Sequence, residues 1–329
     1  MKTWKHLTFV AIIVFAFAFI ACDDGTKETE HIHQWGAWVE TTAPTCTTTG
    51  LETRTCTIDP THKETQTKAI DPNAHDWEWV ITVDPTIFSI GEETYMCTLC
   101  SISQNTRIAE KLNSISNTKE WNDAVEFIKN GGNDQTYTIT VNGNIGLEGY
   151  IYGTNTFGSV TNLSITIVGT GKLYLTGQGN MLGIGGSQTL IIDSDDLTFE
   201  GLTNGINDVT QNNNASIIRV GSSGQLELRN GIIANNNSGS SAAGGGVFIS
   251  YASSNTGFTK TGGIIYGNDA SNAVDNNNAP QNMGHAVGYR AVDGALYYHD
   301  ATLEEGDNLS TNDPLPTNSG ETLGGWTKA

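Results

Sequence analysis

The strongest constraint on the fold is a short phrase that the chain repeats. Residues 230–235 read NGIIAN, and residues 262–268 read GGIIYGN, about one solenoid coil further along. A weaker echo relates residues 168–175 to residues 220–228. Repetition over roughly 20–50 residues is typical of solenoids, in which like strands stack on one another. The phrase therefore predicts a parallel β-helix.

Short runs of alternating apolar and polar residues extend from residue 136 to residue 298, and Gly, Asn, Asp or Ser bounds each run. Such strands would also fit a β-sandwich. Asparagine runs at residues 212–214, 235–237 and 276–278 favour the solenoid, because Asn tolerates the left-handed backbone of tight turns. We expect an all-β fold in which residues 135–329 form a right-handed parallel β-helix of about six or seven coils.

Residues 117–129 carry the one convincing helical pattern outside the N-terminal segment. Asn117 is a suitable N-cap, Glu120 can complete a capping box, and Gly131 follows the last turn. A single apolar stripe is formed by Trp121, Ala124, Val125 and Ile128. Because the open end of a β-helix exposes unpaired backbone, we expect residues 111–134 to cap it.

Residues 1–21 have the pattern of a secretory signal. Lys2 and Lys5 precede an apolar run, residues 7–20, that is shorter than the roughly 20 residues of a transmembrane helix. We expect cleavage after Ala21, which leaves residues 22–30 as a polar tether. Ordinary cleavage near Ala21, with a free cysteine after it, is the alternative.

The segment Phe19-Ile20-Ala21-Cys22 resembles the lipobox of spirochaete-type bacterial lipoproteins. The resemblance implies that Cys22 becomes a lipidated N-terminus carrying acyl chains such as palmitate. The protein would then be exported and anchored through this lipid to the cell envelope, at the outer membrane or the cell surface. Cleavage would leave 14 basic and 35 acidic residues, so that the net charge changes from −19 to −21. Such a charge argues against a nucleic-acid partner.

Residues 31–110 contain two copies of a small module with Cys, His and Trp. His33-Gln34-Trp35 aligns with His75-Asp76-Trp77, and residues 50–57 align with residues 91–98. Alternation before Cys56 predicts a β-hairpin in each copy. Each copy is too small to bury a core of its own, so a cross-link is expected.

Two kinds of cross-link fit the cysteines. In an exported protein disulfides persist, and Cys46 with Cys56 is the natural pair. Cys97 and Cys100 would close a tight ring or stay reduced. The alternative is a zinc site in which this CxxC forms one corner and another Cys, or His62, completes the ligands. We expect structural cysteines without a cofactor. A redox role is disfavoured separately, because a thioredoxin-like CxxC begins a helix and nothing helical surrounds Cys97.

His33 and His75 each precede a tryptophan by two residues, and we interpret them as packing residues rather than ligands. The residues that carry this pattern resemble short His-Trp/Cys repeats on surface proteins of spirochaetes and some other anaerobes. The resemblance implies display or spacing and no further activity.

From Trp121 to the end the chain resembles lipoproteins with a pectin-lyase-like right-handed β-helix. The matching phrases are Tyr137–Thr140, Gln188–Leu190, Gly244–Val247 and Thr261–Ile265. The fold occurs in pectate lyases, polygalacturonases, autotransporter passengers and adhesins, so it does not decide the function.

The best acidic cluster consists of Asp193, Asp195 and Asp196, in one turn between two expected strands. We interpret these residues as solvated or capping; a calcium site or a catalytic pair is the alternative. Bases could come from Lys172, Arg219, Arg229 and Lys260, none of which accompanies an acidic motif.

The sequence thus favours an adhesin-like binding protein over an enzyme. Its membrane contact would be the lipid anchor, and its ligand an extracellular protein, a host protein or a polysaccharide. The alternative is a polysaccharide lyase or glycoside hydrolase of the pectin-lyase-like fold. Clustered acids with a base across adjacent coils would favour the enzyme, and a flat Asn, Thr and Ser side would favour binding.

Overall fold

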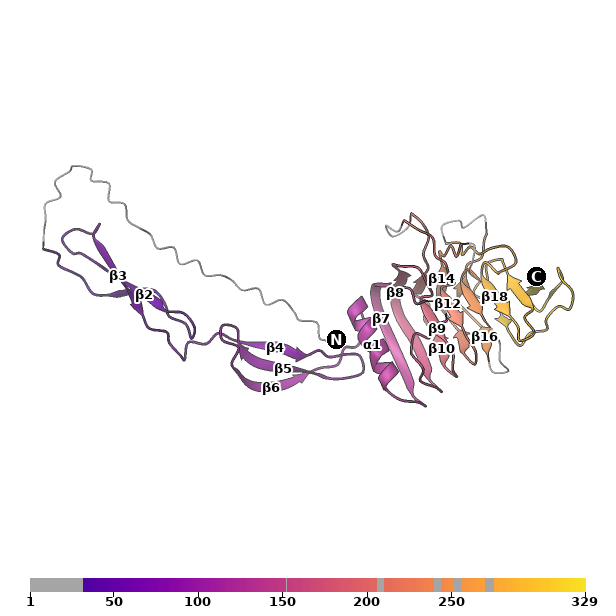
Figure 1. Cartoon of the computed structure of the whole chain (residues 1–329), viewed down its shortest axis with the longest axis horizontal. Helices are drawn as coiled ribbons and strands as arrows, with labels where there is room; N and C mark the ends of the chain where they lie inside the picture. Colours follow the sequence, from indigo (N-terminus) through magenta and orange to yellow (C-terminus); the bar gives the residue numbers. More distant parts are fainter. Residues whose placement is uncertain (1–31, 152, 206–209, 240–243, 251–255, 270–274) are drawn as a thin grey trace. The chain divides into compact units, whose positions relative to one another are not determined.

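The structure is a computed structural model, and it describes residues 32–329 except 152, 206–209, 240–243, 251–255 and 270–274 (Figure 1). The described part is mostly β, with one α-helix. The chain divides into two compact units, residues 1–77 with 97–101 and residues 78–96 with 102–329. The expected signal, Cys22 and tether lie outside the described residues. The described helix is neither long nor apolar enough to cross a membrane.

Each copy of the small module folds as a three-stranded sheet, not as the expected hairpin. The first sheet has the order β1 (Val39–Thr42), β2 (Gly50–Thr55), β3 (Lys63–Lys68), and the second has the order β4 (Trp77–Val83), β5 (Gly91–Cys97), β6 (Ser103–Ala109). The first strand of each sheet carries no clean alternation of buried and exposed residues. That is why the sequence pattern missed both strands.

The two copies share a close backbone approach that only glycine permits. A Cβ at Gly50 would lie 2.6 Å from the carbonyl oxygen of Thr42, and a Cβ at Gly91 would lie 2.3 Å from that of Val83. The middle strand of each sheet therefore begins with glycine for the same steric reason.

The expected helix is confirmed as α1 (Thr118–Asn130), with one difference at its N-terminus. Asn117 Oδ1 accepts a hydrogen bond of 3.0 Å from the Glu120 amide, as expected for an N-cap. The Glu120 carboxylate, however, reaches Ser116 N at 2.7 Å instead of the amide of the cap residue. The predicted stripe is buried and packs in the core cluster beside β7 (Thr136–Leu147) (Figure 1).

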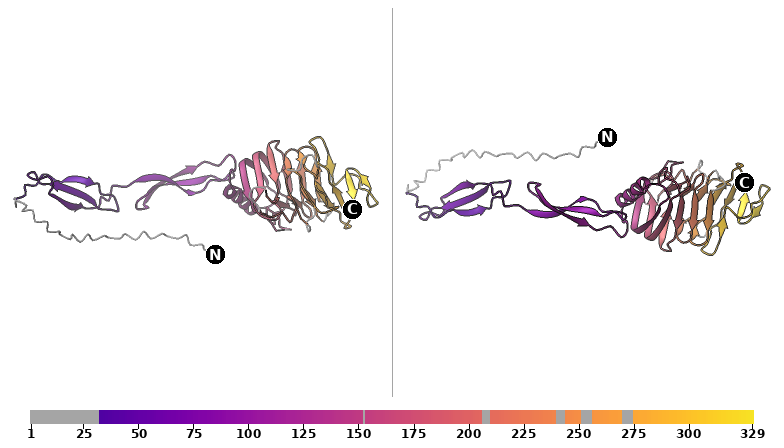
Figure 2. Two further views of the ribbon diagram at one scale, coloured as in Figure 1. Left: turned by 90° about the horizontal axis from the view of Figure 1, so that it is seen from above. Right: turned by 90° about the horizontal axis from the view of Figure 1, so that it is seen from below.

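Beyond the helix, strands stack in three parallel ladders (Figure 2). β7 pairs along its whole length with β8 (Ser164–Leu175). The first ladder continues from β8 through β10 (Thr189–Ile192), β13 (Gln225–Leu228) and β16 (Gly257–Lys260). The second continues from β8 through β11 (Leu197–Glu200), β14 (Ile232–Ala234) and β17 (Ile264–Ile265). The third consists of β9 (Leu182–Ile184), β12 (Ile218–Val220), β15 (Val247–Ile249) and β18 (Val287–Arg290).

The register of the second ladder confirms the main sequence repeat. Ile232 lies opposite Ile264, and Ile233 lies opposite Ile265. The weaker echo is wrong as a stacking relationship, because β13 pairs with β10 and β16 whereas the second half of β8 pairs with β11. Similar apolar alternation on different ladders produced that resemblance.

Parallel stacking ends earlier than expected. The first ladder has five layers, β7, β8, β10, β13 and β16, where the sequence predicted six or seven coils. A turn with Gly294 at φ 84° then reverses the chain, so that β19 (Leu296–His299) runs antiparallel to β18. The last strands, all antiparallel to their neighbours, are β20 (Leu309–Ser310), β21 (Thr322–Leu323) and β22 (Trp326–Lys328).

The three asparagine runs serve a purpose other than the predicted one. Of their nine residues only Asn235 has a left-handed backbone, with φ 54°. The middle residues Asn213, Asn236 and Asn277 are buried, and their side-chain amides bond to backbone groups of neighbouring layers. Asn236 Nδ2 donates to two buried carbonyls at 2.9 and 2.8 Å, and its Oδ1 accepts from Leu202 N at 3.1 Å. The runs therefore satisfy backbone groups that the turns leave unpaired.

Replacing Asn236 by Ala should destabilise the second unit by about 3 kcal/mol or more, since each unsatisfied buried polar group costs about 1–3 kcal/mol. Urea unfolding followed by circular dichroism measures the change. The matched control is Asn214→Ala, because Asn214 is exposed, and its effect should stay within about 0.5 kcal/mol. Equal effects of the two substitutions would contradict a structural role for the buried amide.

Candidate metal centre

Four metal-ligating side chains of the first unit converge. They are Cys46, His75, Cys97 and Cys100, and their ligand atoms all lie within 4.8 Å of one another. Cys97 is buried and the other three are partly buried. Among the residues that the structure describes, no other group of three or more such side chains meets this spacing.

Two hydrogen bonds position the first two ligands. Cys46 lies in the turn between β1 and β2, where Thr45 Oγ1 accepts a hydrogen bond of 2.9 Å from Thr48 N. Cys46 N donates to the carbonyl oxygen of Ala74 at 3.1 Å. This bond holds the turn against the segment that carries His75.

The other two ligands come from the turn after β5. Cys97 ends that strand, and its carbonyl oxygen accepts a hydrogen bond of 2.9 Å from Ser101 N. Ser101 adopts a left-handed backbone, with φ 59°, which closes the turn. Cys100 Sγ then lies 3.3 Å from His75 Nδ1, and the His75 ring packs against Trp77 at 4.9 Å between centroids.

The distances fit a tetrahedral ion better than a disulfide. Cys46 Sγ and Cys97 Sγ are 3.7 Å apart, and Cys46, Cys97 and Cys100 form no disulfide. A disulfide needs about 2.05 Å, whereas two thiolates on one zinc ion, each with a bond of about 2.3 Å, lie about 3.8 Å apart. Three sulfurs and one imidazole form a Cys₃His donor set, which is typical of structural zinc sites.

The surroundings favour the thiolate form of Cys97 and disfavour that of Cys46. Burial disfavours the Cys97 thiolate, but backbone amides of Leu99 and Cys100 and the His75 side chain outweigh it and lower the pKa of Cys97 to about 6. Burial and the neighbouring thiols raise the pKa of Cys46 to about 12. A bound cation would remove this conflict, because it favours the deprotonated form of every ligand.

The structure corrects the predicted cysteine pairing. Cys46 does not pair with Cys56; it lies with Cys97 and Cys100, which belong to the other copy of the module. Cys56 is buried and its amide donates to the His62 carbonyl oxygen at 3.0 Å, so both residues lie outside the candidate centre. The sequence predicted a disulfide within copy one because the two cysteines of that copy are close in the sequence.

His75 was interpreted as a packing residue, and it does pack against Trp77. It also faces the cysteines, so it belongs to the candidate centre. The signal that could have found it is present in the sequence, since His75 directly follows the end of copy one and precedes the CxxC.

The predicted acidic cluster does not gather around a cation position. Asp193 Oδ1 accepts a hydrogen bond of 2.9 Å from Asn230, and its other oxygen lies 3.7 Å from the Arg229 guanidinium. Asp195 lines a cavity of about 300 Å³ with Asn230 and Glu305. Asp193, Asp195 and Asp196 do not belong to any described group of three ligands that could hold calcium.

The prediction that no base accompanies an acidic motif is wrong for Arg229, which contacts Asp193 of the acidic cluster. Arg229 contacts Glu227 at 2.7 Å as well as Asp193, and Lys172 contacts Glu200 at 2.6 Å. The contacts Arg229–Asp193 and Lys172–Glu200 join adjacent layers of the ladders, which separation along the sequence concealed. By contrast, Lys260 is buried and donates to the carbonyl oxygens of Glu304 and Asp307.

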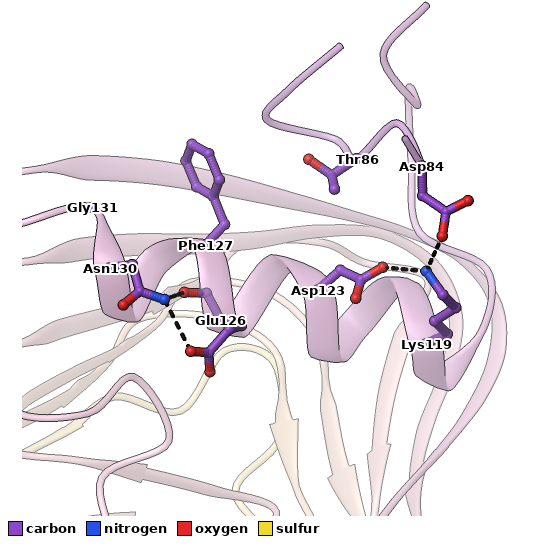
Figure 3. A pocket seen from close by; sticks show the side chains of 8 residues that line it. All are labelled: Asp84, Thr86, Lys119, Asp123, Glu126, Phe127, Asn130 and Gly131. Atoms are coloured by element: carbon purple, nitrogen blue, oxygen red, sulfur yellow. Dashed lines mark hydrogen bonds and ion pairs between the residues drawn. The ribbon is translucent and has the colours of Figure 1, made fainter. Parts of the chain in front are cut away.

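A hollow of about 510 Å³ lies beside α1, and several of the side chains that line it form ion pairs or hydrogen bonds with one another (Figure 3). Lys119 Nζ bridges Asp84 at 2.7 Å and Asp123 at 2.8 Å. Hydrogen bonds to Asp123 and then Asp84 raise the pKa of Lys119, so the lysine stays charged. The ion pairs of Lys119 therefore link the loop after β4 to the helix.

The thiolate assignment can be measured directly. In the metal-free chain the ultraviolet absorbance of thiolate should rise with a midpoint near pH 6, because the pKa of Cys97 is about 6. Cys97→Ser should remove this step, and Cys56→Ser, outside the centre, should keep it. A metal-free chain without thiolate below pH 8 would contradict the assignment.

Comparison of the chain with known proteins gives no relative from which a role for the four ligands could be transferred. No protein-family model, no curated protein and no solved structure matches it. The assignment of the centre therefore depends on its own donor set and distances.

Proposed function

We propose that this protein is an exported lipoprotein, anchored to the cell envelope through Cys22, that presents a right-handed parallel β-helix for binding. The two small modules form a stalk stapled by a structural zinc ion. The β-helix binds a polysaccharide or another extracellular polymer through one flat side. The observation that carries the binding role is an in-register array of polar side chains on the first ladder.

The zinc staple explains how the small sheets stay folded. Every residue of β1 and of β3 is exposed, so the first sheet has little core of its own. Its turn contributes Cys46, and copy two contributes Cys97 and Cys100. Ligands drawn from both copies would let one ion stabilise both turns, as metals do in domains too small for a hydrophobic core.

Three parallel ladders with aliphatic interiors support the β-helix assignment. In the first ladder Ile165, Leu190 and Leu226 lie opposite one another and are buried. The residues that alternate with these along each strand point away from the core. Right-handed winding is the expected sense for parallel crossover connections.

The outward residues of the first ladder form two rows across five layers. One row consists of Thr136, Ser164, Thr189, Gln225 and Gly257. The other consists of Thr138, Thr166, Ile191, Glu227 and Thr259. Six of these ten residues carry a hydroxyl, namely Thr136, Ser164, Thr189, Thr138, Thr166 and Thr259. Layers are about 4.8 Å apart and alternate residues about 6.7 Å apart, so these hydroxyls lie at regular spacings. A regular lattice of hydrogen-bonding groups suits a ligand that itself repeats, such as a glycan chain.

A second candidate, a polysaccharide lyase or hydrolase, is favoured by one observation. Asp193 and Glu227, from adjacent layers, both contact Arg229. The hydrogen bond with Glu227 raises the pKa of Arg229, however, so the guanidinium is a poorer base than an isolated one. Both carboxylates are engaged by the same cation, which lowers their value as a general acid and base pair. We therefore place binding first.

The binding role can be tested on arrays of glycans and matrix proteins with the full chain in detergent. Thr138→Val with Thr166→Val should weaken binding about tenfold, since each lost hydrogen bond is worth about 0.5–1.5 kcal/mol. Thr198→Val, on the second ladder, is the matched control and should bind as the unaltered chain does. Release of reducing sugar from a bound glycan would favour the enzyme. If the protein binds nothing on the arrays, or if all variants bind equally well, the first ladder is not a binding surface.

The anchor is tested separately by cell fractionation. Cys22→Ser should move the protein from the membrane fraction to the soluble fraction, because the thiol that would carry the lipid is gone. Cys56→Ser is the control and should stay with the membrane. A Cys22→Ser protein that still partitions into detergent would refute lipidation.

A further inference from the structure

Copy one of the module repeats the ligand positions of the candidate centre. Thr57 N donates to the Gln34 carbonyl oxygen at 2.7 Å, and Thr98 N donates to the Asp76 carbonyl oxygen at 2.8 Å. The residues beside these partners are therefore equivalent in the two copies. His33 takes the position of His75, and Cys56 takes the position of Cys97.

The turns that follow extend the equivalence. Cys100 stands three residues after Cys97, and Asp59 stands three residues after Cys56. Copy one then adds His62, whose Nε2 lies 4.0 Å from the Asp59 carboxylate. In copy one an aspartate thus stands at the position of the second cysteine of the CxxC, and His62 lies beside it.

The two histidine rings of this set are already neighbours, and the backbone of Cys56 bonds to that of His62. The His33 and His62 rings meet edge-on with 4.9 Å between centroids, and the His33 ring stacks on Trp35 as His75 packs on Trp77. Cys56 is 1% exposed, and its amide bonds to the His62 carbonyl oxygen. The ligand atoms are spread more widely than in the candidate centre, so binding an ion requires the rings to turn.

We infer that His33, Cys56 and His62 form a second zinc site, weaker than the first. Cys46 in the turn of copy one completes the set of copy two, but it cannot also serve its own copy from there. Among the described residues no cysteine is left for the fourth position in copy one, which we assign to water or another exchangeable ligand, as in zinc sites with three protein ligands. Two imidazoles and one thiolate are a donor set that zinc accepts.

The turn that carries Cys46 in copy one has an equivalent in copy two, but that turn holds no metal ligand. Thr86 N donates to the Ser89 carbonyl oxygen at 2.9 Å, as Thr45 N does to that of Thr48 at 3.0 Å, so Ile87 occupies the position of Cys46. Ile87 and Phe88 pack against the apolar core of the second unit. The turn that donates a thiolate in copy one thus supplies apolar contacts in copy two.

Cobalt titration of the metal-free full chain in detergent tests the inference, because Co²⁺ bound to thiolate absorbs strongly and occupies tetrahedral zinc sites. Two equivalents should bind, the second with at least tenfold lower affinity. Cys56→Ser and His62→Gln should each lose only the weaker equivalent, and Cys97→Ser only the tighter one. The tight-site spectrum in the first two variants shows that the module is still folded. His299→Gln, in the second unit, is the control and should keep both.

Three results would overturn the second site. They are a single equivalent in the unaltered chain, two equivalents in Cys56→Ser, and loss of the weaker equivalent in Cys22→Ser, which would assign its fourth position to that thiolate instead of an exchangeable ligand. Loss of the tighter equivalent in Cys97→Ser tests the stapling centre independently. Failure of the second site is thereby distinguished from failure of the proposed stalk.

Discussion

Register between parallel strands is the constraint on which the larger unit depends. Each layer places a buried aliphatic residue over that of the layer before it, as Ile265 over Ile233 shows, and the preceding residue in the strand is less buried. A slip by one residue would expose the core of a whole layer, because side chains alternate with a period of two. The buried amides of Asn213, Asn236 and Asn277 fix the turns in the same register. Aliphatic stacking and amide pairing thus specify the same alignment.

The small modules depend on a different kind of force. Their strands bury few side chains, and the side chains that do converge are sulfur and imidazole. With the proposed zinc ion bound, the first unit would gain stability from ligand convergence, whereas the second gains it from apolar burial. Conditions that remove metal should affect the first unit and leave the core of the second intact.

Local signals in the sequence predicted much of the larger unit. Helix α1, most strand positions between residues 136 and 298 and the pairing of the Ile-Ile phrases follow from periodicity and turn residues, which act over short range, whereas β9 and β16 were not predicted. The early end of stacking could not be predicted, because it depends on where the chain after Gly294 packs. Nor could the cysteine partners, since Cys46 and Cys97 are 51 residues apart and meet only after both sheets form. The ion pair of Arg229 with Asp193 was missed for the same reason.

The reversal after β18 has a consequence for assembly. A stack of parallel strands has two terminal edges, and each could template the addition of another molecule into a fibril. Helix α1 covers β7 at one edge, while β19, β20 and the fully buried Trp326 close the other with antiparallel pairing. The number of layers is consequently fixed within a single polypeptide, and growth by end-to-end polymerisation is blocked at both ends.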